Sequence, residues 1–386
     1  MFCWCFFTFI RLLNRYLRVF RLVICQYLRK FAPLKFVGCL NGLIQWYCLV
    51  AQSIVIAKYR FRLPRSYTST KCSFCDTKIW YFNGVITDLL KSTLLSKQHP
   101  FNTQISRSRQ VNTMNKTFIF NNRKINYALH HHHANRPYLV LVHGFCSDHQ
   151  VWDAFIPILS PHYNLLLPDM AGYGQSEMWN EWTIEGMADM IAALLITENI
   201  SRCLLIGHSM GGYVAITFAH RHADKLLGLM LFHTTAFDDD EVKKRNRRQA
   251  IYLIQKYGTR PFLTAFYDSL FTKPYAKQHP EVVNVQEQRA ERLSMDVIVR
   301  SSEAMIARPD RSFVLAQLNC PVAYVMGKHD TFTTYRRNLD ECYLPKISCL
   351  YWLPNAGHMS MWEDTKQSSA HVLAFAAFCT INQYII

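Results

Sequence analysis

The chain has 386 residues, a length that suits one enzyme domain with an insertion or two average domains. It carries 43 Lys and Arg against 27 Asp and Glu, but 17 of these bases and only two of the acids lie in residues 1–113. Residues 114–386 are therefore nearly neutral, and their charge gives no support for nucleic-acid binding.

Residues 1–113 form a basic, partly hydrophobic N-terminal extension. Residues 36–57 make an apolar stretch long enough to span a bilayer, although Asn41, Gln45 and Gln52 are costly in hydrocarbon. Three interpretations stay open: membrane contact through residues 1–113, a hydrophobic segment with no bilayer role, and a true translation start at Met114, downstream of the assigned one. Residues 63–113 show no sustained helix or strand period.

Six cysteines follow residue 113, and their spacing is not that of a disulfide framework. In a domain of this size, scattered cysteines are mostly small core residues in a reducing compartment. We therefore expect the enzyme portion to be cytoplasmic. The six are Cys146, Cys203, Cys320, Cys342, Cys349 and Cys379.

The elements predicted for residues 114–232 alternate between apolar strands and helices. Strands are expected over 117–120, 124–129, 138–142, 164–167, 203–206 and 226–232, and helices through 152–158, over 183–196 and over 212–222. The first two strands flank Asn121-Asn122, which predicts an antiparallel hairpin. The later strands are apolar on both sides, which is typical of a mostly parallel central sheet flanked by helices.

Residues 237–312 interrupt this alternation. They are helical in pattern and hold no buried strand, which predicts an inserted helical lid. Strands resume over 322–326 and 348–352, and a helix over 367–381 closes the chain. Several lid side chains could line an acyl pocket or pack the lid onto the body, so the substrate-binding residues stay unknown: Tyr252, Phe262, Phe266, Tyr267, Leu270 and Phe271.

The sequence Gly207-His208-Ser209-Met210-Gly211 fits G-x-S-x-G and lies between an apolar strand and a helix. Its glycines permit the crowded turn that raises a serine hydroxyl above a sheet, and the N–H of Met210 then points toward an oxyanion. This placement predicts Ser209 as a nucleophile.

A serine hydroxyl needs a base, and a histidine base needs a carboxylate that fixes its tautomer. His358 follows the last predicted strand, and Asp330 follows the strand before it, so both loops emerge at the same sheet edge as Ser209. We predict His358 as the base and Asp330 as the orienting acid. The rival acids Asp238, Asp239 and Asp240 are better explained as helix N-terminal caps.

With these residues in place, the chain from 117 to 386 resembles the α/β-hydrolase superfamily, in particular its serine esterases and lipases with a helical lid. His143-Gly144-Phe145 is similar to the H-G-x oxyanion segment of that family, which implies the Phe145 N–H as a second oxyanion donor beside Met210. Residues 169–176 resemble the D-x-x-G-x-G-x-S loop of the family, and Asp169 is expected to hold that loop near the site.

The resemblance and the triad together imply hydrolysis of a carboxylic ester, or a related thioester or lactone, of a small to medium apolar substrate through an acyl-enzyme. This chemistry requires no metal and no organic cofactor. A triad-retaining small-molecule receptor, a lyase and a cofactor-free peroxidase on the same fold are the alternatives. The oligomeric state and the identity of the ester are left open.

Overall fold

The computed structural model describes residues 78–81, 114–131, 136–180 and 182–382. Nine strands are found within these ranges: β1 (Lys78–Tyr81), β2 (Met114–Phe120), β3 (Arg123–His130), β4 (Tyr138–Val142), β5 (Asn164–Pro168), β6 (Cys203–His208), β7 (Leu226–Phe232), β8 (Val322–Gly327) and β9 (Ile347–Leu353). They form one sheet in the order β1-β9-β8-β7-β6-β4-β5-β3-β2. This sheet belongs to a compact unit that spans Thr70–Ile386.

The sheet is mostly parallel, as predicted. Its neighbouring strands are parallel except where β3 pairs with β5 and β2 pairs with β3. The β2–β3 pair is the predicted hairpin, and its turn residues Asn121 and Asn122 have φ of 50° and 58°. Two consecutive positive φ angles define the turn type that matches strand twist, and asparagine tolerates them better than most residues.

Helices of the described residues connect the strands of the sheet. They are η1 (His149–Trp152), α4 (Ile156–Leu159), α5 (Ile184–Thr197), α6 (Met210–Arg221), η2 (Ala223–Lys225), α7 (Glu241–Tyr257), α8 (Thr259–Leu270), α9 (Lys273–Gln278), α10 (Pro280–Ala290), α11 (Met295–Ala307), α12 (Ser312–Gln317), α13 (Tyr335–Leu339), α14 (Ser360–Glu363) and α15 (Thr365–Asn382). Every residue of β6, β7 and β8 is buried, so helices cover both faces of the sheet there.

Two predicted elements differ from the structure. The single helix expected through 152–158 is two short pieces, η1 and α4. The side chain of Asp148 accepts from Gln150 N and starts the first piece, whereas the second begins at Ile156 and has Pro157 in its first turn. No strand was identified in residues 63–113, which show no sustained helix or strand period, but β1 lies there and pairs in parallel with β9. A strand of four residues is too short to show the two-residue period on which such a prediction depends.

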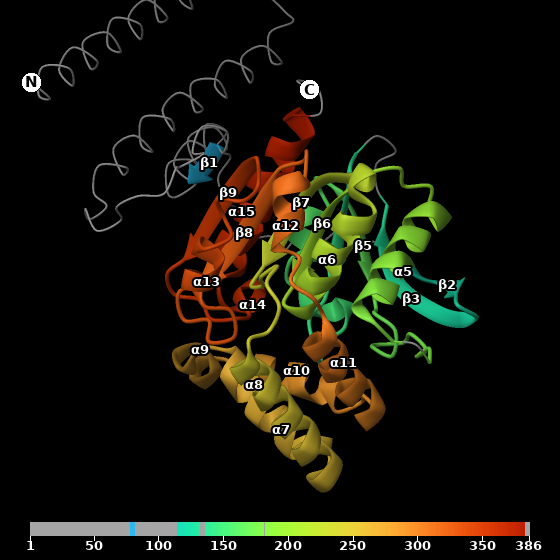
Figure 1. The fold of residues 1–386 in the computed structure, drawn as a ribbon, viewed down its shortest axis with the longest axis vertical. Helices are drawn as coiled ribbons and strands as arrows, with labels where there is room; N and C mark the ends of the chain where they lie inside the picture. The colour runs from blue at the N-terminus through green and yellow to red at the C-terminus, as the bar shows by residue number, and fades with distance from the viewer. Residues whose placement is uncertain (1–77, 82–113, 132–135, 181, 383–386) are drawn as a thin grey trace, which may run out of the picture. The chain divides into compact units, whose positions relative to one another are not determined.

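The helices α7 to α11 occupy the range predicted as a helical insertion, between β7 and β8, and they lie together at one end of the sheet (Figure 1). A buried ion pair anchors the start of the insertion, because Asp239 contacts Arg308 at 2.9 Å and Arg247 at 2.6 Å. The predicted cap is correct for Asp240, whose side chain accepts from Lys243 N. It is wrong for Asp239, because the helix begins only at Glu241 and the Asp239 side chain turns inward to the arginines.

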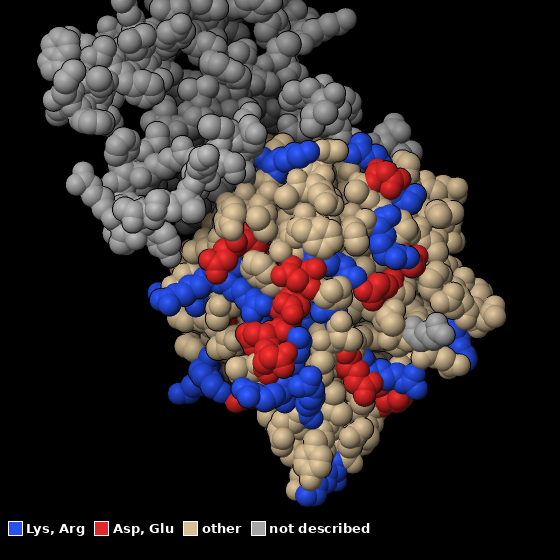
Figure 2. All heavy atoms as spheres, in the orientation of Figure 1, with Lys and Arg blue, Asp and Glu red and all other residues tan. Residues whose placement is uncertain are grey.

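Five of the six cysteines after residue 113 are buried, as predicted, and all six are free thiols in the described residues. Acidic and basic side chains alternate over the described part of the face in Figure 2, in agreement with the near-neutral charge of residues 114–386. None of the helices that the structure describes is both long and apolar enough to cross a bilayer. The apolar stretch 36–57, with its predicted membrane contact, lies outside the described residues.

Candidate active site

Ser209 lies at the sharp turn between β6 and α6. Its φ of 53° and ψ of −117° are rare for a residue with a side chain, and its side chain is only partly buried. The turn is held because Ser209 N donates to Phe232 O at 3.0 Å and the Thr234 hydroxyl donates to Ser209 O at 2.7 Å. A hydroxyl is therefore raised at the carboxyl end of the sheet, where parallel α/β sheets place their reactive groups.

Asp330 and His358 are joined by a hydrogen bond at the same end of the sheet. Asp330 follows β8, His358 follows β9, and His358 Nδ1 lies 2.9 Å from Asp330 Oδ2. Burial opposes ionisation of Asp330, but the charge of His358 and the hydrogen bonds from His233 and His358 outweigh it and hold the pKa of Asp330 well below its usual range. The carboxylate is thus an anion, which makes His358 Nδ1 the protonated nitrogen and leaves Nε2 as the acceptor.

His208 connects the Ser209 turn to the His358 loop. Its Nε2–H donates to the backbone oxygen of His358 at 3.0 Å, and the two ring centroids are 5.0 Å apart. The Ser209 hydroxyl itself forms no hydrogen bond to the His358 ring among the described residues. Asp330 and His358 are therefore in direct contact. Ser209 is connected to them through the adjacent residue His208, which contacts His358.

The segment His143-Gly144-Phe145 approaches the same turn. A Cβ atom added to Gly144 would lie 3.2 Å from the Cβ of Ser209, so the two backbones are in close contact. His143 fixes this segment because its Nε2 accepts from Met170 N at 2.9 Å, which leaves its Nδ1–H to donate to Gly144 O at 2.8 Å. In the part of the chain that the structure describes, the N–H groups of Phe145 and Met210 donate to no protein acceptor.

Asp169 holds the loop after β5, as expected. Its Oδ1 accepts from His149 N at 2.9 Å, and its Oδ2 accepts from Asn126 Nδ2 at 2.7 Å and from Gln175 N at 3.1 Å. Gly174 has φ of 55°, and a Cβ atom there would lie 2.2 Å from Asp169 Oδ2. Both features require glycine at position 174, so this loop is fixed around one buried carboxylate.

Aromatic side chains of the insertion reach the site. Phe266 in α8 lies 5.6 Å from the ring of Phe145 and 5.6 Å from that of Phe332, which in turn lies 5.0 Å from His358. Phe262 stacks on Phe266. The other insertion residues considered as pocket candidates differ in burial. Tyr267, Leu270 and Phe271 are buried, whereas Tyr252 is exposed.

The sequence did not point to two residues that support the candidate triad, one by contacting Asp330 and one by contacting the chain neighbours of His358. His233 donates to Asp330, and Glu363 accepts from the N–H groups of Gly357 and Met359 on either side of His358. His233 had a signal that could have been used, because it is a polar residue directly after the apolar strand β7. Glu363 had none, since its partners are backbone groups.

Among the described residues, His233, Asp330 and His358 also form a group of three buried side chains that could hold a metal ion, with their potential ligand atoms within 4.8 Å of one another. Their mutual hydrogen bonds already use the Nδ1 atoms of both histidines and one carboxylate oxygen. A metal ion would have to replace these bonds.

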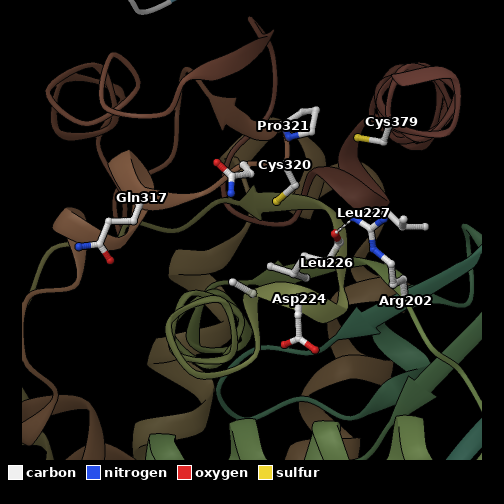
Figure 3. A pocket seen from close by; sticks show the side chains of 10 residues that line it. Arg202, Asp224, Leu226, Leu227, Gln317, Cys320, Pro321 and Cys379 are labelled. Carbon is white, nitrogen blue, oxygen red and sulfur yellow. Dashed lines mark hydrogen bonds between the residues drawn. The ribbon is translucent and has the colours of Figure 1, made fainter. Parts of the chain in front are cut away.

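A cavity of about 510 Å³ lies elsewhere, at the amino ends of β6, β7 and β8 (Figure 3). Arg202, Leu226 and Cys320 contribute to its wall, and Cys379 of α15 faces it. Ligands of open parallel sheets bind at the carboxyl ends of the strands. We therefore do not assign this cavity to the chemistry of Ser209.

The chain is similar to known hydrolases across the region just described. Residues 137–266 match the family described as alpha/beta hydrolase fold, and this range includes Phe145 and Ser209. A protein from Acinetobacter baylyi named carbamate hydrolase RutD is 25% identical over 261 residues, which cover 65% of this chain and 97% of that protein. A 2-succinyl-6-hydroxy-2,4-cyclohexadiene-1-carboxylate synthase from an Enterobacter species is 26% identical over 59% of this chain and 87% of its own length.

The fold is also similar to that of a solved hydrolase structure. A thermophilic esterase from Thermogutta terrifontis superposes with a TM-score of 0.63 and 26% identity, covering 69% of this chain and 98% of that one.

Proposed function

This chain belongs to the α/β-hydrolase superfamily, and from that premise we propose that it is a serine hydrolase. It cleaves a carboxylic ester, or a related thioester or lactone, of a small to medium apolar substrate through an acyl-enzyme. Ser209 is the nucleophile, His358 the base and Asp330 the acid that orients it. The observation that carries the proposal is the strained Ser209 turn at the sheet edge where the Asp330–His358 hydrogen bond lies.

In the first half of the reaction, Ser209 Oγ attacks the ester carbonyl carbon while His358 Nε2 takes the hydroxyl proton. The carbonyl oxygen becomes an oxyanion, which accepts from the unpaired N–H groups of Phe145 and Met210. Each such donor is worth about 3 kcal/mol in the transition state. The carbon–oxygen bond to the alcohol then breaks, and His358 gives the proton to the departing alcohol oxygen.

In the second half, His358 takes a proton from water, and the resulting hydroxide attacks the acyl carbon. The acyl–Ser209 bond breaks, the proton returns to Ser209 and the carboxylic acid leaves. Hydrogen bonds of such sites are often long without substrate and shorten in the reacting complex. The absent Ser209–His358 hydrogen bond is therefore compatible with this mechanism.

An apolar substrate is supported by the surroundings of His358. Phe145, Phe262, Phe266 and Phe332 form a connected aromatic cluster next to it, partly from the body and partly from the insertion. Apolar walls with few polar groups are typical of small-molecule sites. We propose that α8 acts as the lid over this site.

The test is intact-mass measurement of the full chain after treatment with a fluorophosphonate, beside Ser209→Ala. We expect one adduct on the parent and none on the variant, together with turnover of an ester, thioester or lactone that Ser209→Ala abolishes. Equal labelling or equal turnover of the two proteins would contradict the proposal. Tight binding of a small ester to a folded parent without adduct or turnover would favour the receptor alternative.

A second candidate function has one observation in its favour. The similar Enterobacter protein carries the name of a synthase and not of a hydrolase. An elimination on the same three residues would release a product without adding water. Product analysis separates the two functions, because hydrolysis gives an acid and an alcohol, and solvent ¹⁸O enters the acid.

A further inference from the structure

A second imidazole binds the carboxylate of Asp330. His233 directly follows β7, and its Nδ1 lies 3.0 Å from Asp330 Oδ2, the same oxygen that His358 Nδ1 contacts at 2.9 Å. The other ring nitrogen of His233, Nε2, lies 2.7 Å from Ser360 Oγ. His233, Asp330, His358 and Ser360 are all buried.

The environment of His233 fixes its protonation. Burial lowers the pKa of His233, and the charge of His358 acts in the same direction, so that together they outweigh Asp330. His208 from the β6 turn and Glu363 from α14 also face it. A neutral His233 beside a carboxylate carries its proton on Nδ1, donates it to Asp330 Oδ2, and accepts from the Ser360 hydroxyl at Nε2.

Asp330 then accepts four hydrogen bonds. Its Oδ2 accepts from the two imidazoles, and its Oδ1 accepts from Phe332 N at 2.9 Å and Thr333 N at 3.0 Å. Four is the full acceptor capacity of a carboxylate. The carboxylate is therefore fixed in rotation, and its charge is divided between His233 and His358.

The backbone of His233 is held in an uncommon conformation to make this contact. Its φ is 51°, a left-handed value that is uncommon for residues other than glycine, although histidine adopts it more often than most. The conformation is kept by His233 N, which donates to Val325 O at 3.0 Å, and by the Thr333 hydroxyl, which donates to His233 O at 3.2 Å. Backbone strain of this kind is concentrated at functional sites.

We propose that His233 is a positioning residue of the reaction, which fixes the Asp330 carboxylate by donating to Oδ2 and thereby sets how strongly Asp330 stabilises the His358 cation. The inference rests on the proposed function of Ser209, Asp330 and His358. Without the His233 donor, the Asp330 carboxylate can rotate away from His358. In the molecules where the Asp330–His358 hydrogen bond is kept, the carboxylate stabilises the His358 cation more strongly. The first effect lowers kcat, and the second moves the acid limb of the pH profile to higher pH.

The experiment compares three substitutions in the full chain. His233→Ala and His233→Gly both remove the donor, and glycine also relieves the positive φ. His233→Asn keeps an amide N–H near the position of Nδ1 and tolerates the left-handed backbone. His371→Asn is the matched control, because His371 lies in α15, stacks on Tyr351 and does not contact Asp330.

With a p-nitrophenyl ester, we expect His233→Ala and His233→Gly to lower kcat about tenfold, which corresponds to the loss of one hydrogen bond in the transition state. KM stays nearly constant, the acid limb of kcat/KM shifts upward in pH, and the fluorophosphonate labelling rate falls with kcat. His233→Asn restores most of kcat, and His371→Asn changes neither constant. Unchanged kcat in the alanine and glycine variants, or an asparagine variant as impaired as alanine, would overturn the proposal.

A second measurement needs no variant of His233. Nitrogen-15 spectra of histidine-labelled protein, with Ser209→Ala as a second sample, report the tautomer of each buried imidazole. We expect two neutral rings with Nδ1–H hydrogen-bonded to a carboxylate, and His233 with its proton on Nε2 would overturn the inference. Full turnover by Ser209→Ala would instead refute the proposed function, whatever the state of His233.

Discussion

The turn at Ser209 depends on a glycine that lets two backbones touch. A Cβ atom at Gly211 would lie 2.5 Å from the backbone oxygens of both Val142 and His143, where no side chain can move aside. We expect Gly211→Ala to destabilise the fold by about 2 kcal/mol and to reduce fluorophosphonate labelling, because α6 must shift away from β4. Urea unfolding and labelling rates measure the two effects.

Gly186→Ala is the control for this prediction. Position 186 is inside α5, where alanine is a better helix former, and the nearest atom to an added Cβ is the Thr183 hydroxyl at 3.2 Å. Equal effects of the two substitutions on stability and labelling would show that the close contact at Gly211 is unimportant.

Glu341 is predicted to make the stability of the protein depend on pH. Its carboxyl is buried, and Oε2 accepts from Ala236 N at 2.8 Å and from the Thr235 hydroxyl at 3.0 Å, while Oε1 has no partner in the described residues. Burial raises the pKa of Glu341 to about 8. Because the folded pKa lies above the unfolded one, the contribution of the protonated group is complete below the unfolded pKa and is lost as pH rises through about 8.

We therefore expect Glu341→Gln, which cannot ionise, to lose this pH dependence. Relative to the parent, the variant gains stability from pH 6 to 9, on the order of 3 kcal/mol at the upper end. Melting temperatures across this range test it, with the exposed Glu303→Gln as the control. A difference between variant and parent that is constant with pH would contradict the assignment.

At the scale of elements, α14 links the His358 loop to the insertion. Glu363 accepts from Gly357 N at 2.8 Å and Met359 N at 3.2 Å, and its other oxygen accepts from Thr272 N at 2.7 Å, between α8 and α9. His358 N also donates to Leu270 O at 3.1 Å. The His358 loop is thus held by the insertion as well as by the sheet.

We expect Glu363→Gln to loosen both contacts, because one carboxylate oxygen becomes an NH₂ group that faces a backbone N–H. The loss of these bonds should cost about 1 to 3 kcal/mol, lower kcat and speed hydrogen exchange at Gly357, Met359 and Thr272. Amide exchange followed by mass spectrometry measures it. The exposed Glu281→Gln in α10 is the control, and protection that persists in the Glu363 variant would count against the link.

Most element types followed from the sequence because their signals are local. Apolar runs marked β4 and β7 within one residue, and Asn121-Asn122 marked the hairpin. The predictions from sequence were wrong where a contact with a residue distant in the chain determines the role of a side chain. The carboxylate of Asp239 lies eight residues from Arg247 and 69 from Arg308, so its role as an inward anchor could not be read from the helix start beside it.

At the scale of the whole chain, positive charge is concentrated outside the described residues. Residues 1–69 hold 11 Lys and Arg and no Asp or Glu, whereas the compact unit that contains the sheet begins at Thr70. We expect the full chain to bind vesicles that contain phosphatidylserine, and residues 70–386 to lose that binding while keeping kcat/KM in solution. Co-sedimentation at low and high salt measures it, with phosphatidylcholine vesicles as the control. Equal binding by both proteins would contradict this prediction.

The sequence by itself determined the parallel sheet and the position of Ser209, Asp330 and His358 at the ends of β6, β8 and β9, because in a parallel sheet chain order and strand ends fix the edge at which a loop emerges. Only the tertiary structure decided that His233 shares Asp330 with His358, that Glu363 supports the His358 loop, and that Phe266 reaches the site. His233 and Asp330 are 97 residues apart. Their contact arises from how neighbouring loops pack, and no local period of the sequence encodes that packing.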